Sequence, residues 1–225
     1  MPTPDSTCWT IIQAAAAGSA TDREAFARRY GPVVRAYLAA RWRSSPCLHD
    51  LDDAVQEVFV ECFKPDGVLD RADRGRGFRP FLYGVVRNVA LRTEAARGRR
   101  RERPRPSDID LDEVPDGEAS LSQAFDRAWA RAALREAADR MRQRAEAAGP
   151  AAVRRVELLR LRFHDGLPIR DIAGRWQMDA AKLHHEYARA RQEFKAALLE
   201  VVAFHHPGSA LDVAQECGKL LSLLG

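Results

Sequence analysis

The sequence predicts an all-α protein made of two helical domains with a flexible acidic linker between them. Apolar residues recur at helical spacing over long stretches of the 225 residues, and no segment carries the alternating pattern of a strand. The segment 102–119 differs, because it combines prolines with acidic residues and holds too little apolar surface to fold alone. We therefore divide the chain into a first domain at 1–101, this linker, a second domain at 120–204 and a C-terminal extension at 205–225.

Composition limits the classes of protein that fit. A hydrophobic content of 46% and a charged content of 30% are typical of a globular protein that folds in water. The net charge of +4 and the isoelectric point near 9.1 permit nucleic-acid binding without requiring it. The distribution of charge is more informative than the sum, because arginines gather between Arg97 and Arg105 and acidic residues follow them.

The sequence carries no pattern typical of a catalytic or metal site. The four cysteines are scattered and form no Cys-x-x-Cys pair, which argues against a zinc site or a redox motif. We find no nucleophile motif and no glycine-rich phosphate loop, so we expect neither an enzyme nor a cofactor or metal. No apolar run reaches the roughly 20 residues that span a bilayer, and no signal peptide is evident, so we expect a cytoplasmic location without membrane insertion.

The first long helix is predicted from Asp22, as its N-cap, to about Arg43. Pro32 lies inside this stretch, so we expect a kink or a break near Tyr30-Gly31. The apolar stripe consists of Phe26, Tyr30, Val33, Val34, Tyr37 and Leu38.

An acidic helix follows the loop predicted at 44–49. Asp50 is expected to cap it, and Asp53 stands three residues later in a position similar to a capping box. Its apolar stripe consists of Leu51, Val55, Val58, Phe59 and Phe63. The acidic side chains fall largely off this stripe, which leaves them free to meet a partner.

The next helix is basic and aromatic. It is predicted from Arg79 to about Arg97, after a loop at 65–77, with Pro80 suited to its first turn. Its expected buried face consists of Phe81, Leu82, Val85, Val86, Val89 and Ala90. Arginines neutralise phosphates and aromatic rings stack on unstacked bases, so this helix suits opened DNA.

The second domain reads as a series of helices. One helix runs from near Ser120 to about Ala147 and is broken by Gly149-Pro150. The later helices are predicted at about 153–163, 169–176, 180–204 and 210–224, and a short turn at 177–179 separates the second of these from the third.

Two segments of the first domain resemble region 2 of bacterial sigma-70 family factors of the extracytoplasmic-function type. Asp50–Phe59 is similar to the pattern D-x-x-D-L-V-Q-E-V-F, with Ala54 in place of leucine. Phe78–Asn88 is similar to F-R-x-W-L-Y-x-I-A-R-N, with Phe81 in place of tryptophan. The resemblance implies a promoter-specific transcription initiation factor that binds core RNA polymerase and promoter DNA and melts the −10 element.

The resemblance also implies roles for individual residues. The acidic face would bind the clamp coiled coil of the polymerase β′ subunit, through Asp50, Asp53, Gln56 and Glu57. The basic helix and the loop before it would bind and open the −10 DNA, through Arg76, Phe78, Arg79, Tyr83, Arg87, Asn88, Arg92, Arg97, Arg99 and Arg100.

The second domain resembles the helix-turn-helix of sigma region 4, which docks on the polymerase β flap and reads the −35 element. The matching segments are Leu167–Ala173 and Ala188–Phe194. The DNA-facing residues would be Lys182, His184, His185, Arg189 and Arg191. Two departures weaken this match, because Gln177 stands at a left-handed turn position where glycine is common, and Glu186 faces a polyanion poorly unless it accepts from a cytosine amino group.

Two other functions remain open. The chain is alternatively a degenerate sigma-like adaptor that reads no promoter, or a stand-alone helix-turn-helix DNA-binding regulator. The resemblance also admits an anti-sigma factor as a partner. We expect the extension 205–225 to fold back on the second domain, and a docking site for a regulator is the alternative.

Overall fold

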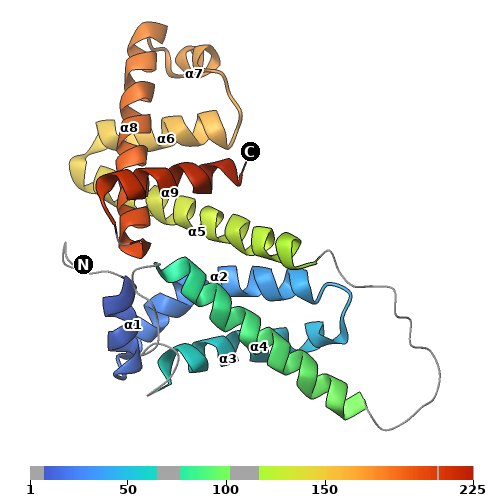
Figure 1. Ribbon diagram of the computed structural model, residues 1–225. Coiled ribbons are helices and arrows are strands. Elements are labelled where there is room, and N and C mark those ends of the chain that lie inside the picture. Colours follow the sequence, from blue (N-terminus) through green and yellow to red (C-terminus); the bar gives the residue numbers. More distant parts are fainter. Residues whose placement is uncertain (1–7, 65–76, 102–116, 207, 225) are drawn as a thin grey trace. The chain divides into compact units, whose positions relative to one another are not determined.

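The computed structural model describes residues 8–64, 77–101, 117–206 and 208–224, and every element within these ranges is a helix (Figure 1). The predicted all-α class is therefore confirmed. The elements in chain order are α1 (Cys8–Ala16), α2 (Ala20–Arg41), the short 3-10 helix η1 (Pro46–Asp50), α3 (Leu51–Phe63), α4 (Phe78–Arg101), α5 (Gly117–Ala148), α6 (Pro150–Phe163), α7 (Ile169–Trp176), α8 (Ala180–His205) and α9 (Ala210–Ser222). Among the helices of these ranges, none has the length and apolar character to cross a membrane.

The chain forms two compact units whose limits differ from the predicted domain boundaries. Unit 1 combines Met1–Ala132 with Ala203–Gly225, and unit 2 is Ala133–Val202. The expectation that the C-terminal extension folds back on the second domain is therefore wrong. Of the predicted linker, 102–116 lies outside the described residues, whereas its last residues already belong to α5.

The N-cap of α2 is Ser19, three residues before the predicted cap Asp22. The Ser19 hydroxyl accepts the backbone N–H of Asp22 at 3.3 Å and donates to the Asp22 carboxylate at 2.5 Å. Asp22 therefore lies inside the first turn, where its negative charge is favourable near the helix N-terminus. A serine hydroxyl is as good a cap as an aspartate carboxylate, and the structure uses Ser19 rather than the predicted Asp22.

A kink or a break was expected near Tyr30-Gly31. Helix α2 runs through Pro32 without ending, so the break is wrong. A proline in a helix interior removes one hydrogen bond and costs about 3 kcal/mol. Tyr30, Val33 and Val34 are all buried on either side of it. The burial of these side chains in one face of a continuous helix offsets the cost of the proline.

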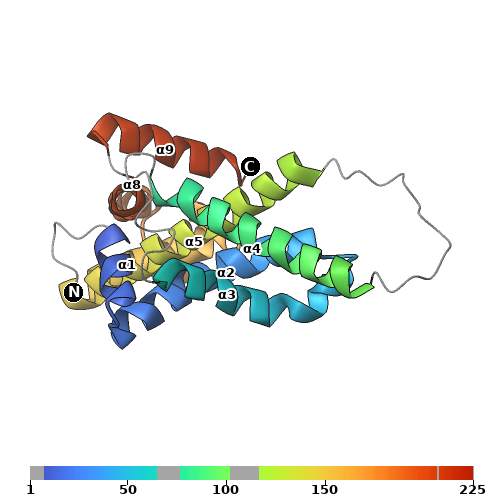
Figure 2. The ribbon, with the colours of Figure 1, turned by 60° about the horizontal axis from the view of Figure 1, so that its bottom comes forward.

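The core of unit 1 is rich in aromatic side chains. The ring of Phe78 lies 4.8 Å from that of Tyr30 and 6.0 Å from that of Phe26, measured between centroids. Tyr30 also stacks on Trp129 of α5, at 5.8 Å. Helix α3 packs beside α4 over this core (Figure 2). The helices that carry the predicted polymerase residues and the predicted −10 DNA residues therefore pack on the same core.

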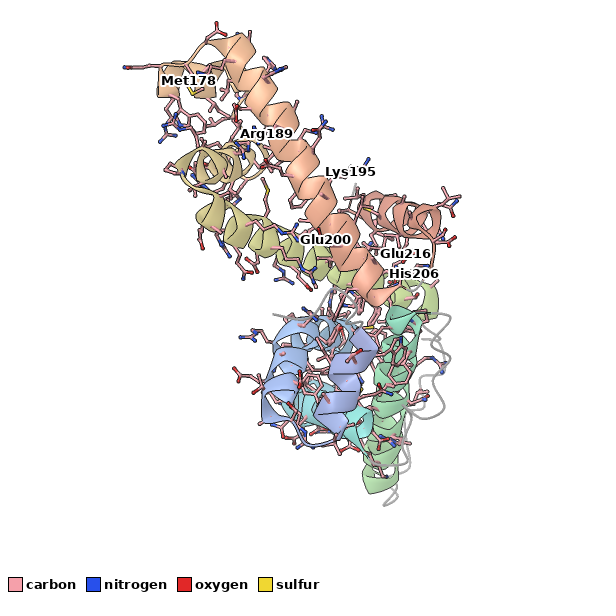
Figure 3. All side chains as sticks on the ribbon, turned by 90° about the vertical axis from the view of Figure 1, so that its left-hand side faces the viewer. Met178, Arg189, Lys195, Glu200, His206 and Glu216 are labelled. Atoms are coloured by element: carbon pink, nitrogen blue, oxygen red, sulfur yellow. The ribbon has the colours of Figure 1, made fainter. Side chains whose placement is uncertain are left out.

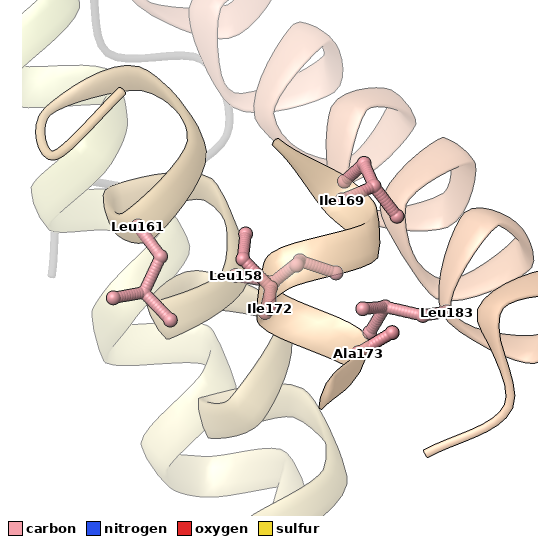
Figure 4. Close-up of a cluster of buried hydrophobic side chains, with 6 residues drawn as sticks. All are labelled: Leu158, Leu161, Ile169, Ile172, Ala173 and Leu183. Atoms are coloured by element: carbon pink, nitrogen blue, oxygen red, sulfur yellow. The ribbon is translucent and has the colours of Figure 1, made fainter. Parts of the chain in front are cut away.

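The core of unit 2 joins α6, α7 and α8. Its buried side chains are Leu158, Leu161, Ile169, Ile172, Ala173 and Leu183 (Figure 4). Gly149 has φ +102°, a backbone conformation that suits glycine, and Pro150 opens α6, so the predicted break between α5 and α6 is confirmed. This core fixes the position of the first turns of α8 against α7.

Candidate functional site

Acidic residues of α3 and its N-terminus pair with arginines of α4. The Asp50 carboxylate accepts from Arg97 through Nε at 2.5 Å and Nη2 at 2.8 Å. These hydrogen bonds raise the pKa of the Arg97 guanidinium above its ordinary value. Asp50 stands at the N-cap position of α3, as predicted, but its side chain makes no cap hydrogen bond, because Arg97 engages the carboxylate.

A second pair lies further along the same two helices. Arg92 contacts Glu61 at 3.1 Å and Glu57 at 3.4 Å. The side chains of Arg92 and Glu57 are 54% and 50% exposed, so this ion pair is weak and easily exchanged for another partner. Asp53 and Gln56, the other two predicted polymerase-binding residues, are exposed on α3.

The start of α4 is buried rather than open. Phe78 is 0% exposed, and its ring meets Trp9 of α1 at 5.4 Å. The structure therefore uses this predicted DNA-binding residue in the core of unit 1. Phe81 was expected on the buried face of α4 and contacts the same Trp9, at 5.3 Å.

Arg79 lies between two carboxylates that the sequence did not bring together. It is 3.2 Å from Glu216 of α9 and 3.7 Å from Asp126 of α5. Burial raises the pKa of Asp126. The positive charge of Arg79 lowers this pKa in part, and the negative charge of Glu216 raises it further. Tyr83, one turn along α4, packs its ring against Tyr37 at 5.6 Å and Phe125 at 5.3 Å.

The remaining predicted residues of this helix are placed as follows. Arg87 is partly buried and Asn88 is exposed. Arg79, Tyr83 and Arg87 are four residues apart, and this spacing puts them on one side of α4. Arg76 lies outside the described residues, and so do the side chains of Arg99 and Arg100.

Glu94 connects α4 to the end of α2, a role that we did not predict. Its carboxylate accepts from Arg41 through Nε at 2.6 Å and Nη2 at 2.9 Å, and from the indole N–H of Trp42 at 2.8 Å. The Glu94 carboxylate raises the pKa of Arg41 above its ordinary value. The only signal for it in the sequence is an acidic residue within a basic helix, which does not identify its partners.

The cysteines lie inside unit 1. Cys8, Cys47, Cys62 and Cys217 are all buried, and none of these four is part of a disulfide. Burial raises the pKa of both Cys8 and Cys62 to about 12, so these thiols stay protonated and unreactive near neutral pH. They act as small core residues.

In unit 2 the predicted −35 residues all lie on the surface of α8. Lys182, His184, His185, Arg189 and Arg191 are each exposed. Figure 3 shows Arg189 and Lys195 along α8, with Met178 at the turn that precedes it. Asp179 helps to start α8, because its carboxylate accepts the backbone N–H of Lys182 at 2.9 Å.

The turn between α7 and α8 has the strained residue that the sequence predicted. Gln177 has φ +51° and ψ +42°, in the left-handed region, and it is the one non-glycine residue with positive φ within the described part of the chain. Its backbone N–H donates to the carbonyls of Ala173 and Gly174 and closes the end of α7.

Glu186 turns toward a buried arginine. Arg155 of α6 is only 7% exposed and donates to Glu193 at 2.9 Å and to Glu186 at 3.4 Å. These carboxylates, Glu193 foremost, raise the pKa of Arg155 above its ordinary value. Glu186 therefore braces α8 against α6 in this structure, in place of the cytosine contact that we considered.

This geometry first defines a class of protein. Unit 1 sets an acidic helix beside a basic, aromatic one, an arrangement suited to holding a protein partner and a nucleic acid on one base. Residues 26–102, which include most of α2 and all of η1, α3 and α4, match the family model for sigma-70 region 2. This match supports a sigma-70 family factor with a role in transcription initiation, and in that family region 2 interacts in general with core RNA polymerase and promoter DNA. No curated protein sequence matches the chain.

Proposed function

We propose that this chain is a promoter-specific initiation factor of the extracytoplasmic-function type, in which α3 binds core RNA polymerase, α4 holds and opens the −10 DNA and α8 reads the −35 element. The observation that carries the proposal is the packing of α3 beside α4 within the matched region. The placement of both binding helices on one core would keep the DNA in register with the polymerase.

On α3, the exposed side chains of Asp53 and Gln56 are available for a first contact with a basic partner. Glu57 and Asp50 already hold arginines, so arginines of the polymerase would replace Arg92 and Arg97 as their partners. Such an exchange leaves the number of ion pairs unchanged. Complementary charge here would therefore speed and orient docking more than it would raise the affinity.

The same exchange would prepare α4 for DNA. When the polymerase takes the carboxylates of α3, Arg92 and Arg97 are released toward phosphates, and each phosphate contact releases counterions. Binding of polymerase and binding of DNA would therefore assist each other. Tyr83 and Arg87, on the neighbouring side of the helix, supply a ring for stacking and a further cation.

In unit 2, the exposed basic side chains of α8 support contact with duplex DNA. The α7–turn–α8 arrangement, with α7 buried against α6, presents the N-terminal half of α8 outward. Arg155 holds the acidic side chains Glu186 and Glu193, which keeps two negative charges away from the DNA phosphates.

The deciding experiment is in vitro transcription from a genomic promoter library, with core RNA polymerase, in the presence and absence of the chain. New start sites that share two spaced motifs are the expected result. Binding to core without new starts would favour the sigma-like adaptor. No binding to core would leave the stand-alone regulator as the better explanation.

Two neighbouring aspartates test the polymerase-binding face. Asp53→Asn should weaken binding to core, with most of the loss in the association rate. Asp52→Asn removes the same charge from the next residue, whose carboxylate pairs with Arg35 instead, and it serves as the matched control. Equal binding by both variants would overturn the assignment of Asp53.

A further inference from the structure

We infer that the C-terminal segment Ala203–Ser222 is an internal cover for the start of α4, which DNA must displace before Arg79 can bind a phosphate. The inference rests on the proposed function, because it takes Arg79 as a DNA contact. The structure supports it through an aromatic anchor, a close backbone approach and a charge pair, all within unit 1.

The anchor is His205 at the end of α8. Its Nε2 lies 2.9 Å from the Tyr30 hydroxyl in a buried hydrogen bond, and its ring meets the edge of Trp129 at 5.1 Å. Beside it, Phe204 is buried and the guanidinium of Arg29 lies over its ring, at 4.7 Å from the centroid. The segment is therefore fastened to the same aromatic core that holds Phe78 at the beginning of α4.

The backbone of this segment passes directly against the residue that precedes α4. A Cβ atom added to Gly77 would lie 3.1 Å from His206 Nδ1 and 3.2 Å from the carbonyl oxygen of His205. Gly77 also has φ +81°, which favours glycine. The close approach leaves no room for a side chain between the segment and the start of α4.

Helix α9 then brings a carboxylate to Arg79. Ser209 and Asp212 form a capping box at its beginning, so the helix has a defined start. Val213, Cys217 and Leu220 are buried along one side of α9. Glu216 lies next to this buried stripe and contacts Arg79 at 3.2 Å, and Figure 3 shows it together with His206 near the start of α4.

The pair differs from the exposed ion pairs of α3 and α4 in its burial. The side chains of Glu216 and Arg79 are 12% and 24% exposed, so water screens this contact less than it screens Arg92 with Glu57. Asp126 adds a second carboxylate at 3.7 Å. A phosphate that approaches Arg79 meets two negative charges and must replace them, which is a competition between the segment and the DNA.

The test uses the full chain without polymerase and a fluorescein-labelled single-stranded oligonucleotide of random sequence. Glu216→Gln should raise its affinity about fivefold, the lower range of coupling between sites. The slope of log K against log salt should steepen by about 0.7, the value for one added phosphate contact on a single strand. Arg79→Gln in the same chain should remove the gain. Glu24→Gln, which removes the same charge from an exposed position of α2, is the matched control.

A second readout is hydrogen exchange of the α9 amides in the wild-type chain, which should rise when the oligonucleotide is added. Unchanged affinity of the Glu216→Gln chain, or α9 exchange that DNA does not alter, overturns the cover. Transcription with core polymerase is scored separately. If the chain starts no transcripts but Glu216→Gln raises its affinity for the oligonucleotide, the proposed sigma role is wrong and the cover still stands. If the chain starts transcripts but Glu216→Gln leaves the affinity unchanged, the sigma role stands and the cover is wrong.

Discussion

The brace between Arg155 and the two glutamates of α8 gives an asymmetric prediction. A buried ion pair can be replaced by an apolar side chain of similar size at little cost, because the desolvation of the charge disappears together with the attraction. Removal of the partner is costly, because it leaves a buried charge without compensation. Arg155→Met should therefore destabilise unit 2 less than loss of the carboxylates that face it.

The magnitudes follow from the exposure of the three side chains. Arg155 is 7% exposed, whereas the side chains of Glu186 and Glu193 are 36% and 33% exposed and can regain water. Arg155→Met should therefore change the free energy of unfolding by less than about 1 kcal/mol. The double change of both glutamates to glutamine should cost about 2 kcal/mol, below the 3–5 kcal/mol of a fully broken buried pair, because an amide oxygen still accepts from the guanidinium.

Urea titration followed by hydrogen exchange measures this in the full chain, on the amides of α6 and of α8 up to Val202, since these residues lie in unit 2. Glu157→Gln, which loses an exposed pair with Arg160 on the outer side of α6, is the control for the loss of a charge. Destabilisation by Arg155→Met equal to or above that of the double variant would refute the desolvation argument.

Three further changes test other parts of the structure. Glu94→Ala should lower the free energy of unfolding of unit 1 by about 2 kcal/mol, because Arg41 loses a carboxylate that accepts two of its hydrogen bonds. Urea titration measures the change, and a loss under about 0.5 kcal/mol would contradict this. Gly174 lies inside helix α7, and a Cβ added there would meet no neighbouring side chain or element within 4 Å. Gly174→Ala should therefore raise the free energy of unfolding by about 1 kcal/mol, and a lowered melting temperature would contradict this. Hydrogen bonds from Arg144 lower the pKa of Glu200 in the folded state, so its contribution is present above the ordinary pKa of about 4.3 and is lost as pH falls through the lowered value. The stability gap between wild type and Glu200→Gln should therefore close on acidification, and a gap independent of pH would exclude this linkage.

The helices were predictable because their signal is local. Leu82, Val85, Val86 and Val89 follow helical spacing and are all buried, as the periodicity of α4 indicates. The left-handed conformation of Gln177 was expected from the resemblance instead, because glycine is common at this position of the turn in the family.

The errors concern side chains with two candidate partners. Asp50 was assigned to the helix that follows it, but its carboxylate binds Arg97, 47 residues away. Sequence spacing carries no information on such a contact, because it depends on how α3 and α4 pack. The C-terminal helix shows the same limit: its apolar stripe was evident, but nothing local identified Arg79 as the partner of Glu216.

The hydrogen bond between Tyr30 and His205 joins residues 175 positions apart, and unit 2 lies in the chain between them. A chain leaving the ribosome would thus complete the continuous stretch of unit 2 before it can close the aromatic core of unit 1. Contacts between residues so far apart in the sequence form slowly during folding. The entropic cost of closing the loop between them grows only with the logarithm of its length. The region that would engage polymerase should therefore mature late in synthesis, and a nascent chain halted before His205 should carry an unfinished core.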